Sequence, residues 1–211
     1  TDNESAPSVT LTTSANSIAE NAGSALTLTA TIGNATFEDV TVSIDGTGGT
    51  ADEGTDFGTV SDITISAGAT TGTTSFTPTD DSIYDATSNE TAGISISAVS
   101  GGGASENGDQ SVTITITDNE SAPTLTLSTS ATSIAEDAGS SLTLTATLSN
   151  GTFQDVTAAL GTSGTATEGT DYTDGSGNID DITISAGATT GTVSFTPTND
   201  SIDEANETAT I

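Results

Sequence analysis

Whole classes of residue are missing from this sequence. Its 211 residues include no Cys, Lys, Arg, His, Met or Trp. Without Cys no disulfide can form, and without Lys a Lys–Asn isopeptide cross-link is excluded. Nucleic acid is excluded as a direct partner, because phosphate contacts need Lys or Arg. The usual general bases and nucleophiles are also absent, so we expect no enzyme activity.

The sequence also has no apolar run near 18 residues and no signal peptide. The first absence predicts no membrane insertion. The chain opens in the middle of a pattern that returns later, so we expect an internal segment of a longer secreted or cell-surface protein.

Charge of one sign dominates what is present. Thirty residues are Asp or Glu, and the net charge is -30. Self-repulsion of this size destabilises a compact state unless cations from solvent neutralise it. Apolar residues nevertheless make up 31% of the chain and are well patterned, which argues against disorder.

A tandem repeat organises the chain. TDNESAP at 1–7 returns at 117–123, and DITISAGATTGT at 62–73 returns at 181–192. This period is far longer than the roughly 20–50 residues of a solenoid coil, so each repeat predicts one domain. We expect a junction at 1–7, a sandwich at 8–117, a second junction at 118–123 and a second sandwich at 124–211.

Within each repeat, apolar and polar residues alternate, as in strands with one buried face. Thr occupies many of the intervening positions, and clusters of Gly, Asn and Asp separate the segments. The fold class expected is all-β, with two antiparallel β-sandwiches in tandem. The alternating apolar residues of the first repeat are Leu26, Leu28, Ala30, Ile32, Val40, Val42, Ile44, Ile94, Ile96, Ala98, Val112, Ile114 and Ile116.

The second repeat ends at Ile211, at the position that corresponds to Ile94. Its last strands are therefore absent from the sequence. We weigh two explanations, a cut through a longer array and a final strand supplied by another chain.

Acidic residues gather in the connections between the expected strands. The loops of a sandwich cluster at its two ends, so several carboxylates could converge there. Calcium takes about 6–8 oxygen ligands and accepts carboxylates readily, whereas zinc and copper favour the missing His and Cys. Isolated residues such as Glu38, Asp39 and Glu106 are better explained as a solvated surface.

These loops carry a resemblance to a known family. SIAENAG, GTADEGTDF, DDSIYD and TITDNE of the first repeat, with SIAEDAG, GTATEGTDY and NDSIDEANET of the second, resemble the Calx-beta domain. The resemblance implies an immunoglobulin-like sandwich that binds Ca²⁺ at one end. The ligands it implies are Glu20, Asp56, Asp80, Asp81, Asp85 and Asp118 in the first repeat, and Glu136, Asp171, Asp200 and Glu204 in the second.

The second repeat departs from that ligand pattern. Asn199 stands where the first repeat has Asp80, and Glu204 stands where it has Asp85. The counterpart of Asp118 lies beyond Ile211. We therefore expect the second calcium site to be weaker.

Two functions fit these features. The first is an extracellular structural or adhesive repeat, in which calcium stiffens loops and junctions and neighbouring repeats of the array are the partners. The alternative is a subunit of a self-assembling extracellular filament or matrix, with strands exchanged between chains.

Overall fold

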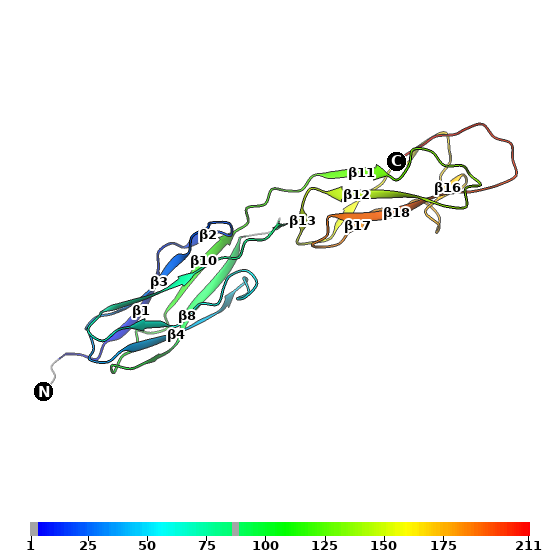
Figure 1. Ribbon diagram of the computed structural model, residues 1–211. Coiled ribbons are helices and arrows are strands. Elements are labelled where there is room, and N and C mark those ends of the chain that lie inside the picture. Colours follow the sequence, from blue (N-terminus) through cyan, green and yellow to red (C-terminus); the bar gives the residue numbers. More distant parts are fainter. Residues whose placement is uncertain (1–3, 86–88) are drawn as a thin grey trace. The chain divides into compact units, whose positions relative to one another are not determined.

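The computed structural model describes residues 4–85 and 89–211, so the first three residues of the expected junction at 1–7 lie outside it. All regular elements among the described residues are β-strands, which confirms the expected all-β class (Figure 1). The described residues form two compact units. Unit 1 contains residues 4–81 and 89–119, and unit 2 contains residues 82–85 and 120–211.

Unit 1 is a two-sheet sandwich. One sheet has the order β6-β3-β1-β9, and the other has the order β2-β10-β8-β4-β5. Pairing is antiparallel except for β1 with β9 and β2 with β10, which are parallel. The strands are β1 (Ser8–Thr13), β2 (Ser17–Ala19), β3 (Leu26–Ile32), β4 (Val40–Gly49), β5 (Ile63–Ile65), β6 (Thr71–Phe76), β8 (Glu90–Ser100), β9 (Ser105–Glu106) and β10 (Ser111–Thr117).

The core of unit 1 lies between these sheets, where alternate residues of each strand point inward. Leu28, Ala30 and Ile32 of β3 are buried, and so are Ile114 and Ile116 of β10. Burial of each Leu or Ile side chain contributes about 1.5–3 kcal/mol relative to exposure. The alternation seen in the sequence therefore marks the buried face correctly over most of its length.

One stretch of that alternation was predicted wrongly. Ala98 was expected on the buried face with Ile94 and Ile96, but it is exposed, and Val99 packs against the core instead. The pairing of β4 with β8 shifts register between Ser43 and Ile44. A bulge of this kind places an extra residue on one strand, so the inward positions beyond it slip by one.

The largest sheet of unit 2 has the order β11-β12-β18-β16, in which β11, β12 and β18 are equivalent to β1, β3 and β6 and β16 is added beside β18. Its other pairs are short, namely β14 with β17, β15 with β19 and β13 with β7. The strands are β7 (Ile83–Tyr84), β11 (Leu125–Thr129), β12 (Leu142–Leu148), β13 (Gly151–Thr152), β14 (Val156–Ala158), β15 (Ser163–Gly164), β16 (Tyr172–Thr173), β17 (Ile182–Ile184), β18 (Thr190–Pro197) and β19 (Ala209–Thr210).

The core of unit 2 is smaller than that of unit 1. Ala146, Tyr172, Ile182 and Ile184 lie in it, and the ring of Tyr172 stacks on Phe195 with centroids 4.6 Å apart. Within the described residues there is no helix of the length and apolarity needed to cross a membrane.

Candidate calcium sites in the end loops

The C-terminal ends of β2 and β10 bring two predicted ligands of unit 1 to the same end of a sheet. These strands run in parallel, with Ile116 opposite Ile18 and Thr117 opposite Ala19. Glu20 and Asp118 directly follow the two strands, so they leave the sheet side by side. The Glu20 amide donates to the Thr117 carbonyl at 3.1 Å, which fixes this exit geometry.

Asp56 organises a second loop of unit 1. Its Oδ2 accepts a hydrogen bond from the Asp52 amide at 2.6 Å, and its carbonyl accepts one from Thr79 at 2.9 Å. The second bond ties the loop after β4 to the segment that carries Asp80. Glu20 and Asp80 in turn each have a carboxylate oxygen within 4.8 Å of the other.

The remaining predicted ligands of the first repeat are placed differently. Asp81 is exposed at the end of the unit 1 segment. Asp85 is half-buried and follows β7, which belongs to unit 2. Although the sequence groups Asp80, Asp81 and Asp85 in one motif, the fold assigns the last of them to a different compact unit.

In unit 2, an acidic cluster forms around Glu204. Asp171, Glu204 and Glu207 have carboxylate oxygens within 4.8 Å of one another. Partial loss of solvent contact raises the pKa of Glu204, and the nearby charges of Asp200, Asp171 and Glu136 raise it further. The other three predicted ligands of the second repeat therefore all lie near enough to Glu204 to raise its pKa.

Glu207 is a member of this cluster that the sequence reasoning missed. Loss of solvent contact raises the pKa of Glu207, with added contributions from the charges of Asp171 and Glu204 and a hydrogen bond with Asp171. A signal was available, because Asn-Glu-Thr occurs at 89–91 and again at 206–208. Glu207 and Glu90 therefore occupy equivalent positions in the two repeats.

Asp171 is held as its counterpart Asp56 is. Its Oδ2 accepts the Thr167 amide at 2.6 Å, and its carbonyl accepts the Thr198 amide at 2.9 Å. The loop geometry is thus the same in both repeats and is fixed by backbone hydrogen bonds. Such a loop presents its carboxylate without the need to order a flexible segment first.

Other loop carboxylates accept hydrogen bonds from backbone amides and so stabilise the fold, without belonging to an acidic cluster. Glu53 accepts the Val60 amide at 2.8 Å, and its equivalent Glu168 accepts the Ile179 amide at 2.6 Å. Asp39, which we expected to be merely solvated, is exposed but accepts the Ala67 amide at 2.8 Å. These hydrogen bonds explain why some acidic positions recur in both repeats without belonging to a cluster.

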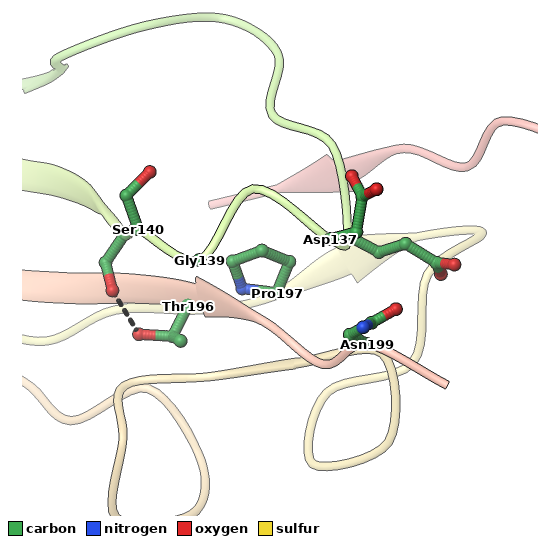
Figure 2. Close-up of a pocket in the computed structure, with 8 residues that line it drawn as sticks. Asp137, Gly139, Ser140, Thr196, Pro197 and Asn199 are labelled. Carbon is green, nitrogen blue, oxygen red and sulfur yellow. Dashed lines mark hydrogen bonds between the residues drawn. The ribbon is translucent and has the colours of Figure 1, made fainter. Parts of the chain in front are cut away.

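A shallow hollow adjoins the unit 2 loops. It encloses about 240 Å³ and includes Glu136, Asp137 and Asn199 in its lining. Figure 2 shows Asp137 and Asn199 toward one end of it, and Ser140 and Thr196 toward the other. The hydroxyl oxygens of Ser141 and Thr196 lie 2.7 Å apart, within hydrogen-bonding distance. Hydroxyl, carboxylate and amide side chains line it together with Pro197 and Gly139, so it offers oxygen atoms to a hydrated cation beside apolar surface.

Several solved structures are similar to the chain at low sequence identity. CBD12 from CALX1.2 is 18% identical, with 89% of this chain and 76% of that one covered and a TM-score of 0.45. A two-domain protein of unknown function from Bacteroides fragilis is 12% identical, with 92% and 85% covered and a TM-score of 0.40. Invasin, a bacterial integrin-binding protein, is 17% identical, with 90% and 35% covered and a TM-score of 0.32.

No curated protein matches the sequence significantly. A family profile, by contrast, matches it twice. The Calx-beta domain profile matches residues 2–120 and again residues 118–211. These two matches confirm the resemblance noted in the loops, and they account for nearly every residue. The chain therefore belongs to the Calx-beta domain family, with two copies of the domain in tandem.

Proposed function

We propose that this chain is a calcium-binding structural or adhesive repeat module of an extracellular or cell-surface protein. Calcium stiffens the end loops and the junctions between repeats, and neighbouring repeats of the array are the partners. The observation that carries the proposal is the convergence of Asp171, Glu204 and Glu207, with carboxylate oxygens within 4.8 Å of one another. No Lys, Arg or His exists anywhere in the chain to balance them.

The donor set fits calcium. Calcium accepts carboxylate, carbonyl and water oxygens in flexible geometry, and the cluster provides carboxylates on preformed loops. Loss of solvent contact is the main cause that raises the pKa values of Glu204 and Glu207, and the charges of neighbouring carboxylates such as Asp171 raise them further. The chain has no cationic side chain that could offset these charges. A bound divalent cation would favour their ionised forms and balance these charges.

Each repeat has its own set of proposed ligands. In unit 2 they are Glu136, Asp171, Asp200, Glu204 and Glu207. In the first repeat they are Glu20, Asp56, Asp80, Asp81, Asp85 and Asp118. In each set, bound calcium would balance the negative charge of the carboxylates. The loops around Asp56 and Asp171 are already fixed by hydrogen bonds to backbone amides.

A calorimetric calcium titration tests the assignment. Glu207→Gln removes one charge from the cluster, and we expect it to weaken calcium binding roughly tenfold or more, because ligand charge sets affinity in such sites. Glu38→Gln is the matched control. It removes the same charge from an exposed residue whose counterpart is the uncharged Gln154. Equal calcium affinities for the two variants would show that the cluster does not bind the ion.

The filament alternative gains no separate support from unit 2. Leu125 and Leu127 of β11 are 43% and 38% exposed, which leaves an apolar strand face uncovered. Residues beyond Ile211 of the same chain and a strand from another chain would cover this face equally well. The exposed face thus fits the repeat module and the filament equally.

A further inference from the structure

A short sheet in unit 2 combines segments from both sequence repeats. β7 pairs in parallel with β13, with Ile83 opposite Gly151 and Tyr84 opposite Thr152. The Phe153 amide donates to the Tyr84 carbonyl at 3.1 Å. β7 belongs to the first repeat by sequence, between β6 and β8, but it is part of unit 2 by its contacts.

The Ile83 side chain packs closely on this edge. A Cβ atom at Gly151 would lie 2.9 Å from Ile83 Cδ1, so the absence of a side chain there makes room for the isoleucine. Gly151 and Thr152 are both buried. The pairing therefore rests on two backbone positions and one apolar side chain.

The first repeat contains an equivalent edge, with which no strand of the described residues pairs. We call the segment Ala35–Phe37, which aligns with Gly151–Phe153, the docking edge. Ala35 is exposed, Thr36 is half-buried and neither forms a strand, whereas both of their counterparts are buried in β13. Phe37 is fully exposed.

The docking edge already has the conformation seen in unit 2. The Thr36 hydroxyl donates to the Glu38 carbonyl at 2.6 Å, and the Thr152 hydroxyl donates to the Gln154 carbonyl at 2.7 Å. The Thr36 carbonyl accepts the Gly68 amide at 2.8 Å, as the Thr152 carbonyl accepts the Gly187 amide at 2.8 Å. The loop is thus preorganised, which lowers the entropic cost of pairing.

The second repeat carries the complementary segment. We call Ser201–Asp203 the insert segment, because Asp200-Ser201-Ile202 repeats Asp81-Ser82-Ile83. Ile202 is 63% exposed, whereas Ile83 is half-buried in the pair with β13. Among the described residues neither the docking edge nor the insert segment pairs with a strand, and the Ile202 amide donates only locally, to Asp200 Oδ1 at 2.7 Å.

We propose that the docking edge binds the insert segment of another repeat of this same type, in the parallel register of β7 with β13. The occupant is a second copy of this repeat, whether it precedes this one in an array or belongs to another chain. The proposal deepens the assignment of neighbouring repeats as partners, and its contacts are separate from the calcium ligands. Consecutive repeats are then linked by strand pairing as well as by their covalent connection.

Chemistry selects this occupant over an unrelated peptide. Two hydrogen-bonded backbone positions give little affinity, so recognition depends on the isoleucine that packs on the edge. The docking edge carries Ala35 where the paired edge has Gly151, and its Cβ would crowd the incoming Ile Cδ1. That atom is the end of a flexible side chain and can shift, so the edge accepts isoleucine but less tightly than unit 2 does.

Disulfide trapping tests the proposal in the complete two-repeat chain, since the protein has no cysteine of its own. Thr36→Cys with Asp203→Cys places thiols at the positions equivalent to the Thr152 and Tyr84 pair. Under oxidising conditions with salt to screen repulsion, we expect a ladder of covalent oligomers. Tyr84→Cys with Thr152→Cys is the positive control, and it should close within one chain.

Three further variants make the result decisive. Ile202→Asp in the double-cysteine chain should reduce the ladder roughly tenfold, because the apolar contact of one isoleucine is lost. Ala35→Gly should increase the ladder, because it removes the crowding Cβ. Thr59→Cys with Asp203→Cys, in which the first thiol sits on an unrelated exposed loop, measures random collision.

A ladder that is equal for the Thr36 and Thr59 pairs, or unchanged by Ile202→Asp, would overturn the proposal. The same comparison is repeated with chelator. Persistence of the ladder without calcium, together with a failed calcium titration, would support strand pairing while refuting the calcium function. Absence of the ladder, together with a normal calcium titration, would refute strand pairing while supporting the calcium function.

Discussion

β1 and β11 are equivalent strands with nearly the same pattern, yet their environments differ. Their partners β3 and β12 are also equivalent and pair in the same register, with Leu11 opposite Ala30 and Leu127 opposite Ala146. Leu11 is 5% exposed, whereas Leu127 is 38% exposed. Unit 1 has β10 opposite β1, with Ile114 and Ile116 in the same core, and the described part of unit 2 has no such strand. Local pattern thus sets strand and register, but burial depends on segments distant in sequence.

The largest expected contrast comes from truncating these two leucines. Leu11→Ala should destabilise unit 1 by about 2–5 kcal/mol, because it leaves a cavity in a packed core. Leu127→Ala should cost less than about 1 kcal/mol, because much of that side chain already contacts water. Unfolding followed by far-UV circular dichroism measures both.

Tyrosine fluorescence makes this contrast specific to one unit. Both tyrosines, Tyr84 and Tyr172, lie in unit 2, so their emission reports the unfolding of that unit alone. The Leu11→Ala loss should appear in the dichroism transition and not in the fluorescence transition. Similar destabilisation by the two variants would mean that β11 is covered in solution by another segment or chain.

A smaller effect tests two equivalent glycines, one in each repeat, that share a positive φ. Gly49 has φ +96°, and a Cβ there would lie 2.0 Å from the Thr91 carbonyl oxygen. Gly164 has φ +127°, with the Thr208 oxygen at the same distance. Gly49→Ala and Gly164→Ala should each cost about 2 kcal/mol or more, through backbone strain and collision. A neutral result for Gly164→Ala alone would show that β15 and β19 are not paired in solution.

The smallest expected effect is a pH dependence confined to unit 2. The pKa values of Glu204 and Glu207 are raised above 4.5, so the folded state binds more protons than the unfolded state between the two pKa values. Without calcium, this contribution to stability is therefore lost as pH rises through the folded pKa and is regained on acidification towards 4.5.

Tyrosine-detected melting between pH 7 and pH 4.5 in chelator measures this effect. Glu207→Gln should flatten the dependence, and Glu38→Gln should leave it unchanged. A dependence that survives Glu207→Gln intact would assign it to other carboxylates.

Sequence reasoning predicts the parts of this molecule that depend on local pattern. The alternation identifies β3 and β12, and the repeated motifs identify the domain family and the loops around Asp56 and Asp171. It fails where long-range geometry decides. The bulge that turns Ala98 outward depends on a pairing between strands far apart in the chain.

The candidate sites show the same limit. Glu207 was missed because its equivalent in the first repeat, Glu90, lies in strand β8, and its position beside Asp171 arises from tertiary contacts. Likewise, nothing local in Ser82–Asp85 indicates that it pairs with a segment of the other repeat. The partner strand lies beyond β8 and β10 in sequence, and backbone pairing leaves little trace in side-chain pattern.

Thermal melting with calcium, with chelator, and with chelator plus sodium chloride at matched ionic strength tests the central claim most directly. A ligand that binds only the native state adds RT ln(1 + [L]/Kd), about 2.7 kcal/mol at a hundredfold excess over Kd. We predict a clear rise in Tm with calcium that sodium chloride does not reproduce, since screening acts on exposed charges and not on coordination. Full recovery with sodium chloride would contradict the account and leave the acidic loops as a diffuse charged surface.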